Sequence, residues 1–439
     1  MRQFILLDGL KDFQLGFHLG YRLAVVLHSH HSHIVPAASA RKGGDHTDKS
    51  AAATQPLSAP AVYWKTGANP VTLRRTCLIS LLASAALYGQ RTATVVSPEV
   101  HPDRKVTFRI RAPKASEVTL TGDWLLPGTA TPKLTKDDTG LWSVTLGPLD
   151  PSIYIYSFTV DGLAIADPVN PKMKLRASTS ASLLEVKAPQ PDFWEARDVP
   201  HGAVEINWQK SKAISGETRA IWIYTPPGYE KGSRRYPVLY LFHGNNDTAA
   251  GWTTAGNANF VMDNLLAEKK IVPMIVVMPW GHATPYGAQA APGGVTNDAL
   301  FEEYVIADVI PTVEAKYRVA SGRQNRAVAG LSMGGGHSLK IGLAHLDLFS
   351  SVASFSGAIP NDFEKRFADL LKDSQGTNGK LKSLWIGCGE QDSLFGRSKS
   401  LSELLTKNQV KHVFRATPGV HNYTIWRKYL SEYTPLLFK

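Results

Sequence analysis

The chain has 439 residues, of which 43% are hydrophobic and 19% charged, as is typical of a globular protein with two or three domains. Its formal net charge is +11, but Lys and Arg are scattered along the chain, which argues for a solvated surface and against a nucleic-acid partner. An acidic polysaccharide is the weaker alternative that this charge could attract. The two cysteines, Cys77 and Cys388, exclude a disulfide framework, and we expect Cys388 to be a small core residue.

The beginning of the chain predicts a targeting segment. Residues 1–70 hold short apolar stretches and a histidine cluster that could bind metal but is more typical of a disordered tail (His28, His30, His31 and His33). Residues 71–90 combine two arginines, a short apolar run and small residues, which predicts a secretory signal peptide. Cys77 lies in this segment and would be removed with it. We therefore expect a secreted or periplasmic protein without membrane insertion. Our hypothesis is that translation begins at Val71 and that residues 1–70 are disordered or not translated.

Residues 95–187 alternate apolar and polar side chains with a period of two. The alternation is clear in four stretches that begin at Val106, Val118, Trp142 and Tyr154. Turn signals such as Asp161-Gly162 separate such stretches. Short alternating strands with frequent turns predict a β-sandwich of immunoglobulin type.

Four motifs in this segment resemble the E-set carbohydrate-binding modules found beside glycogen- and starch-active enzymes: Leu120-Thr-Gly-Asp-Trp124, Gly140-Leu-Trp142, Tyr154-Ile-Tyr156 and Asp167-Pro-Val-Asn170. In that family aromatic rings stack on sugars. Trp142 and Tyr156 fall on inward positions, which favours core packing. Trp124 follows a turn and is our candidate for sugar stacking. A rigid spacer is the alternative role for such a module.

A proline-bearing linker, Lys187–Asp192, leads to residues 200–439, where strands and helices alternate. We expect a helix from about Leu300 to Tyr317 and strands at the positions that follow: from Thr218, Tyr236–Phe242, Met274–Pro279, Val352–Ser356, Leu384–Gly387 and Val413–Ala416. The Tyr236 strand reads as fully buried. This alternation predicts an α/β fold with a doubly wound, mostly parallel sheet and loops gathered at the strand ends.

The motif Gly330-Leu-Ser-Met-Gly334 lies between a predicted strand and a predicted helix. A Gly-x-Ser-x-Gly in that context is the nucleophile elbow of an α/β-hydrolase, where the serine sits on a strained turn and glycines avoid clashes. The sequence therefore makes Ser332 the candidate nucleophile. Backbone amides of Met333 and of Asn245, which follows a His-Gly turn, are candidate donors to an oxyanion.

The elbow requires an acid and then a histidine further along the chain. Asp392 lies in the loop after the strand at Leu384–Gly387, and Glu390 is its near competitor. Only His412 and His421 follow. His412 falls inside a strand pattern, where a packed histidine is ordinary, whereas His421 lies in a loop before the final helix. We therefore expect Asp392 and His421 to complete the catalytic triad.

The hydrolase segment resembles the esterase D group, and within it the feruloyl and acetylxylan esterases of carbohydrate esterase family 1. The resemblance covers roughly residues 200–439 and rests on four motifs: Gly330-Leu-Ser-Met-Gly-Gly-Gly336, Cys388-Gly-Glu-Gln-Asp-Ser-Leu394, Gly419-Val-His421 with Trp426, and Tyr286-Gly287. It implies that Ser332 attacks the ester, His421 shuttles the proton and Asp392 orients the imidazole. It also makes Tyr286 a candidate substrate contact. The Gly-Gly-His of many relatives is here Gly419-Val-His421, a mild departure.

The resemblance implies a serine carboxylesterase that removes feruloyl or acetyl groups from a plant polysaccharide such as xylan, or cleaves a small ester, without metal or cofactor. Enterochelin-type siderophore esterases and acyltransferases share the fold and are alternatives. A carbohydrate-binding protein with an inactive hydrolase is a third reading, against which the intact triad residues argue. Because every candidate catalytic group follows residue 240, we expect the hydrolase to cleave small esters without the sandwich. The sequence leaves the acyl group, the sugar backbone and the oligomeric state open.

Overall fold

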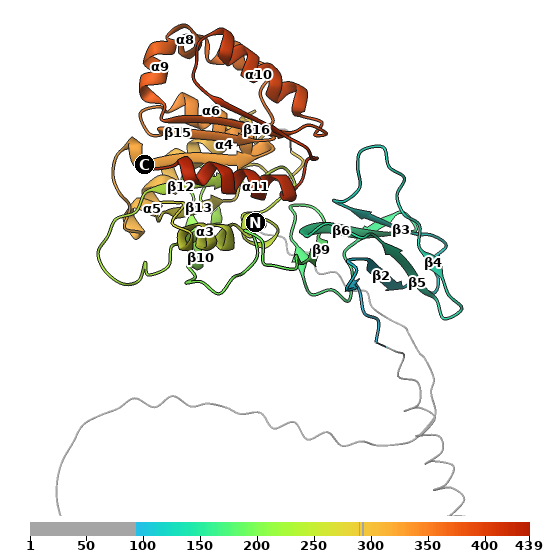
Figure 1. Ribbon diagram of the computed structural model, residues 1–439. Coiled ribbons are helices and arrows are strands. Elements are labelled where there is room, and N and C mark those ends of the chain that lie inside the picture. Colours follow the sequence, from blue (N-terminus) through green and yellow to red (C-terminus); the bar gives the residue numbers. More distant parts are fainter. Residues whose placement is uncertain (1–93, 289, 292–293) are drawn as a thin grey trace, which may run out of the picture. The chain divides into compact units, whose positions relative to one another are not determined.

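The computed structural model describes residues 94–288, 290–291 and 294–439 (Figure 1). The predicted signal peptide and the tail before it lie outside these residues. In the described part of the chain, no helix combines the length and the apolar character needed to cross a bilayer.

Two antiparallel sheets enclose one hydrophobic core at the start of the described chain. The first sheet has the strand order β1 (Glu99–Val100), β2 (Val106–Arg111), β5 (Leu141–Leu146) and β4 (Thr135–Lys136). The second has the order β3 (Val118–Gly122), β6 (Ser152–Val160), β9 (Ala181–Val186) and β8 (Met173–Lys174), and β7 (Leu163–Ile165) pairs with β6. Trp142 and Tyr156 are buried in this core, as predicted from their inward positions. We call these residues the sandwich; its immunoglobulin type stays a prediction.

Strand β6 is buried on both of its faces. Tyr154 and Tyr156 point into the sandwich core, whereas Ile153 and Ile155 belong to a core cluster of the hydrolase. Arg427, only 1% exposed, donates from Nη2 to the Ser152 hydroxyl at 2.6 Å and to the Ile153 carbonyl at 3.3 Å. The sandwich therefore shares a core with the hydrolase, and this argues against the separable domains that we expected from the sequence.

The hydrolase is built on one eight-stranded sheet (Figure 1). Its strand order is β10 (Ala203–Lys210), β11 (Thr218–Thr225), β13 (Ile275–Pro279), β12 (Val238–Phe242), β14 (Arg326–Leu331), β15 (Ser351–Phe355), β16 (Ser383–Gly389) and β17 (Val413–Thr417). The pairs β10–β11 and β11–β13 are antiparallel and all others are parallel. The predicted mostly parallel α/β sheet is therefore confirmed, and Cys388 is buried in β16 as expected.

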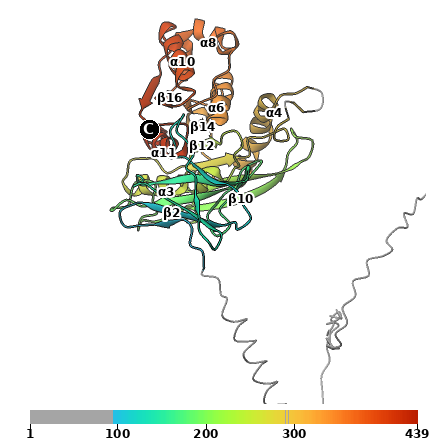
Figure 2. The same ribbon diagram turned by 90° about the vertical axis from the view of Figure 1, so that its right-hand side faces the viewer.

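Helices cover both faces of this sheet, which explains why its central strands are apolar at successive positions. In β12, Tyr240 packs with one cluster and Leu239 with the other. The first cluster includes residues of α4 (Asn297–Tyr304), α5 (Ile310–Lys316), α6 (Met333–Ala344), α7 (Phe363–Arg366), α8 (Ala368–Lys372) and α10 (Phe395–Lys407), and α9 (Ser374–Lys380) follows α8. The second includes α2 (Gly251–Thr254), α3 (Ala258–Ala267) and α11 (Tyr423–Tyr433). Figure 2 shows α8 and α10 at the β16 end of the hydrolase, away from β10.

The helix predicted from Leu300 to Tyr317 is interrupted. It begins earlier, at Asn297, and passes through a π-helical turn at Val305–Val309 before α5 ends at Lys316. Pro311 lies at the start of α5 and has no N–H to continue the regular ladder, so a local change of helix type in front of it is expected.

A buried ion pair joins the two parts of the chain. The Lys174 ammonium of β8 contacts the Asp247 carboxylate of the hydrolase, and the two side chains are 3% and 8% exposed. Burial alone would raise the pKa of Asp247, but the Lys174 ammonium together with the other groups around the carboxylate, such as the Tyr423 hydroxyl, holds that pKa below its ordinary value. Asp247 also accepts a hydrogen bond from the Tyr423 hydroxyl at 2.6 Å. The pair thus connects the sandwich to the start of α11.

We expect Lys174→Met to lower the free energy of unfolding by about 3–5 kcal/mol, because it leaves a buried carboxylate without its cation. Lys172→Met is the matched control, since Lys172 is 59% exposed and its pair with Glu185 lies at the surface. That change should cost about 1 kcal/mol or less. Urea denaturation of both variants checks the prediction. Equal losses would contradict a special role for the buried pair.

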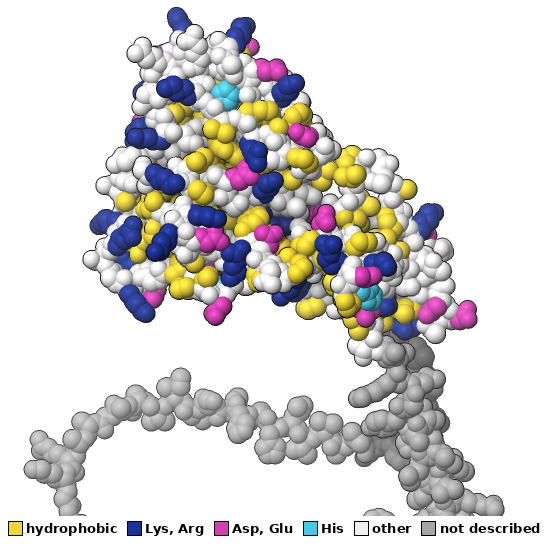
Figure 3. All heavy atoms as spheres, in the orientation of Figure 1, with side chains coloured by type: hydrophobic (Ala, Val, Ile, Leu, Met, Phe, Trp, Pro, Cys, Tyr) yellow, Lys and Arg dark blue, Asp and Glu magenta, His cyan; other side chains and the backbone are white. Residues whose placement is uncertain are grey.

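The surface charges agree with the solvated surface expected from the sequence. On the face shown in Figure 3, Lys and Arg are spread over the molecule with Asp and Glu between them. No single block of one sign covers this face.

Candidate active site

Ser332 stands between β14 and α6 in a conformation that few residues other than glycine adopt. Its φ is 52° and its ψ is −118°. A Cβ on Gly330 would lie 2.4 Å from the Gly334 carbonyl oxygen, and one on Gly334 would lie 2.5 Å from the His243 carbonyl oxygen. Both glycines are therefore required by close backbone approach. Strain held by the surrounding structure is a common feature of functional positions, and the turn leaves the Ser332 side chain partly exposed.

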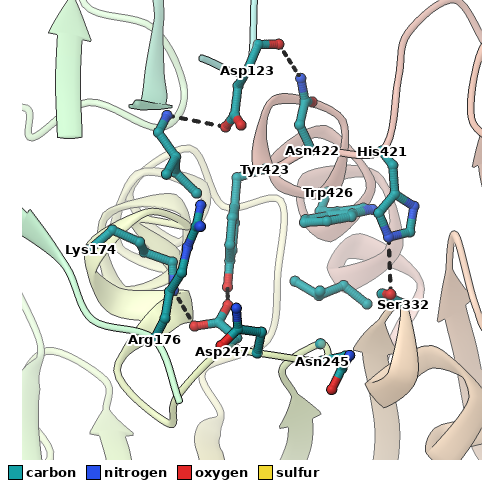
Figure 4. Close-up of a pocket in the computed structure, with 14 residues that line it drawn as sticks. Asp123, Lys174, Arg176, Asn245, Asp247, Ser332, His421, Asn422, Tyr423 and Trp426 are labelled. Carbon is teal, nitrogen blue, oxygen red and sulfur yellow. Dashed lines mark hydrogen bonds and ion pairs between the residues drawn. The ribbon is translucent and has the colours of Figure 1, made fainter. Parts of the chain in front are cut away.

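Two hydrogen bonds connect the three residues that the sequence selected. His421 Nε2 lies 2.9 Å from Ser332 Oγ, and His421 Nδ1 lies 2.7 Å from Asp392 Oδ2. A carboxylate can only accept, so Nδ1 carries the proton and Nε2 is left to accept from the serine hydroxyl. This order of groups can remove a proton from Ser332 when the oxygen attacks a substrate. Figure 4 shows the imidazole of His421 above Ser332 at one side of a cavity.

The Asp392 side chain is fully buried below His421. Burial alone would raise the pKa of Asp392, but the His421 imidazole and the Leu394 amide, which donates to Oδ1 at 2.8 Å, outweigh it. The pKa of Asp392 therefore lies below its ordinary value, and the group stays an ionised acceptor for His421.

Glu390 and His412, the alternatives for the acid and the base, do not take part in this hydrogen-bond chain. Glu390 is exposed in the same loop, and no hydrogen bond joins its side chain to His421 among the described residues. His412 is engaged by the Ser402 hydroxyl at 2.8 Å and the Val410 carbonyl at 2.9 Å. The structure thus brings together the acid and the histidine that we preferred from the sequence.

The turn after β12 is held by a histidine whose role the sequence did not reveal. His243 Nε2 accepts a hydrogen bond from the Gly281 amide at 2.8 Å, and its Nδ1 donates to the Gly244 carbonyl at 2.8 Å. Burial lowers the pKa of His243 to about 4, so the ring is neutral and keeps this tautomer. It fixes the path of the chain toward Asn245.

The two candidate oxyanion donors line a common cavity, and Asn245 also lines the cavity of Ser332 and His421. Asn245 and Met333 line one cavity of about 300 Å³ beside the serine. A Cβ on Gly244 would lie 3.2 Å from Ser332 Cβ, so the β12 turn runs directly past the nucleophile candidate. Tyr286, the candidate substrate contact, lines this same cavity, is 41% exposed and packs edge-on against His282.

Trp124, the candidate for sugar stacking, is only partly exposed. Its ring lies 5.4 Å from Phe108 and 5.8 Å from Tyr154, and it covers Gly122, where an added Cβ would lie 2.3 Å from the indole. The side chain packs on the sandwich core instead of standing free after the turn. Its ring is therefore less available than we expected, and stacking on a sugar stays a prediction.

A second cavity contains Ser332 and His421 and has a wall from the sandwich (Figure 4). Its volume is about 190 Å³. The sandwich contributes four residues, Asp123, Ile155, Lys174 and Arg176. Asn422, which caps α11, donates to the Asp123 carbonyl at 3.2 Å. The sequence analysis missed these contacts because the local pattern of residues 95–187 does not indicate which distant part of the chain packs against the sandwich.

Known proteins agree with this architecture. The family model named Esterase matches residues 211–437, just over half of the chain. The endo-1,4-beta-xylanase/feruloyl esterase of Xylanibacter ruminicola is 31% identical over 350 residues, which are 78% of this chain and 46% of that protein. The acetyl esterase of Caldicellulosiruptor saccharolyticus is 22% identical over 231 residues, 46% of this chain and 82% of that protein.

Among solved structures, the enterobactin esterase from Shigella flexneri is 21% identical with a TM-score of 0.56, and the match covers 76% of this chain and 92% of that chain. A match of this extent reaches beyond residues 200–439 and shows a shared fold. The chain spans less than half the length of the first curated relatives it matches. The family model, which matches just over half of the chain, shows that this chain belongs to the Esterase family.

Proposed function

We propose that the protein is a serine carboxylesterase in which Ser332 is the nucleophile. Its Oγ attacks the ester carbonyl while the hydroxyl proton passes to His421 Nε2. The alcohol leaves with that proton, and an acyl group remains on Ser332. Water then attacks the acyl-enzyme, again with His421 as base, and releases the acid. The continuous hydrogen-bond chain through His421, 2.9 Å to Ser332 and 2.7 Å to Asp392, is the observation that carries this proposal.

The negative charge that develops on the carbonyl oxygen needs donors that are already in place. The amides of Met333 and Asn245 are our candidates, since both residues line the cavity beside Ser332. Met333 is the first residue of α6, where backbone N–H groups lack helical partners and the helix dipole favours negative charge.

For the substrate we propose feruloyl or acetyl esters on a plant cell-wall polysaccharide such as xylan. The names of two relatives, a xylanase/feruloyl esterase and an acetyl esterase, support this class. The predicted signal peptide at residues 71–90 supports action outside the cytoplasm, where such polymers occur.

A panel assay of the full chain tests the substrate. Methyl ferulate, acetylated xylan and a catecholate siderophore ester are incubated with equal enzyme, and the released acid is measured. We expect turnover of methyl ferulate, acetylated xylan or both. Preference for the siderophore ester would replace the polysaccharide assignment, while inactivity on all three would leave esterase activity without a supported substrate.

The pH dependence should show a single protonation on the acid side. Because Asp392 has a pKa below its ordinary range, it stays ionised while the medium is acidified from neutral pH. The group whose protonation stops the reaction is then the His421 imidazole, which must be neutral to accept the serine proton. We expect log kcat/KM for methyl ferulate, whose leaving alcohol is methanol, to fall with a slope of about one per pH unit. A slope of about two would show that a second group, such as a carboxylate, must also be ionised.

A further inference from the structure

The proposed reaction determines on which side of Ser332 the leaving alcohol and the carbonyl oxygen of the ester lie. His421 returns the proton to the leaving alcohol, so the alcohol must lie on the His421 side of Ser332. The carbonyl oxygen lies toward Met333 and Asn245. Asn245 also lines the cavity that contains Ser332 and His421, so this one cavity adjoins both the oxyanion donor and the base, and the leaving alcohol must face the part of its wall away from Asn245.

This wall is supplied in part by the sandwich. Asp123 and Arg176 line the cavity together with Ser332 and His421. Figure 4 shows Arg176 across the cavity from Ser332 and His421, and Asp123 next to Asn422. The cavity has a volume of about 190 Å³.

Arg176 is the cationic side chain of this wall that can bind a ligand. Lys174 also lines the cavity, but its ammonium is taken by Asp247. Among the described residues, no hydrogen bond or ion pair engages Arg176, and its side chain is half-buried. A guanidinium offers five N–H donors in a planar fork, so it can hold two neighbouring oxygen atoms at once.

Asp123 supplies the complementary acceptor. One of its carboxylate oxygens accepts from the Ile155 amide at 3.1 Å, and the other has no partner among the described residues. Burial raises the pKa of Asp123 to about 6, so the group is mainly ionised at neutral and alkaline pH. A donor and an acceptor that line one cavity can together bind hydroxyl groups, which both donate and accept.

We propose that Arg176 and Asp123 bind the hydroxyl groups of a sugar that is the leaving alcohol, and that the sandwich thereby determines alcohol specificity. The proposal rests on the proposed esterase mechanism and assigns the sandwich a direct contact with substrate. Arg176 is the specificity-determining residue of the pair, since Asp123 also has a structural bond to β6.

The test compares two esters that share an acyl group. Full-length wild type and Arg176→Gln are assayed with methyl ferulate and with a feruloylated methyl arabinofuranoside, at neutral to mildly alkaline pH. Hydrogen bonds to a charged group predict that kcat/KM for the sugar ester falls about 10- to 100-fold more than kcat/KM for methyl ferulate. Arg111→Gln is the control, because Arg111 is an exposed arginine of the same sandwich that contacts the Thr139 carbonyl. It should leave the ratio between the two esters unchanged.

The outcomes separate this inference from the proposed function. Equal losses of kcat/KM on both esters in Arg176→Gln would show that the residue supports the active site without recognising the alcohol. Unchanged kcat/KM on both esters would show that Arg176 does not contribute to catalysis or specificity. Either result overturns the proposal. If wild type cleaves neither feruloyl ester, the acyl assignment fails instead. The same comparison is then made with acetylated methyl arabinofuranoside and methyl acetate, where a retained ratio change would still support the alcohol site.

Discussion

Ser332→Ala should reduce kcat for ester hydrolysis by about a million-fold, the loss seen when a triad nucleophile is removed while binding and oxyanion contacts remain. The fold should be unaffected. Among the described residues, the Ser332 hydroxyl hydrogen-bonds only to His421. Alanine has a Cβ like serine, and the elbow already accommodates a residue with a Cβ at a φ of 52°. Steady-state kinetics with the preferred ester and a thermal denaturation curve measure both effects.

A fluorophosphonate probe provides the independent control for this variant. Wild type should be labelled on the peptide that contains Ser332, and Ser332→Ala should not be labelled. A variant that keeps more than about a tenth of the activity would mean that another residue is the nucleophile. A wild type that resists labelling would favour the reading of an inactive carbohydrate-binding protein.

The catalytic candidates could be selected from the sequence because their constraints are local. Gly330 and Gly334 are needed where the backbone passes within contact distance of other backbone, and such glycines leave a readable motif. Asp392 and His421 each follow a strand of a parallel sheet, and the ends of such strands meet at one edge. The order serine, acid, histidine then left few alternatives.

The contribution of the sandwich could not be predicted in the same way, although part of the signal was present. Strand β6 has apolar residues at successive positions, as in Ile153 and Tyr154, and a strand buried on both faces has this pattern. We interpreted it as alternation with one buried face. The pair of Lys174 with Asp247 spans 73 positions, and no local pattern connects residues so far apart.

Trp124 illustrates the same limit from the other direction. A tryptophan after a turn predicted an exposed ring, but three neighbouring aromatic side chains and Gly122 give it a packing surface on the sandwich core. The residue that reaches the active-site cavity is its neighbour Asp123. A turn places several side chains within reach of a site, and only the tertiary contacts decide which one enters it.

Asp392→Asn should lower kcat by about ten-thousand-fold with little change in stability, because the imidazole would be held in the wrong tautomer. The Leu394 amide donates to Asp392 Oδ1 at 2.8 Å, and an asparagine keeps that bond only with its own carbonyl oxygen in the same place. Its NH2 group then faces His421 Nδ1, 2.7 Å away in the wild type, and must donate to it. The imidazole proton moves to Nε2, which can no longer accept the proton of Ser332.

Glu390→Gln is the matched control, since it makes the same chemical change on an exposed carboxylate two positions earlier in the loop. Its rate should stay within about twofold of wild type, as for a surface substitution away from the site. Kinetics of both variants with methyl ferulate, or with whichever ester the panel selects, give the comparison. If the Glu390 variant loses more activity than the Asp392 variant, the orienting acid is Glu390, and the buried bond between Asp392 and His421 has only a structural role.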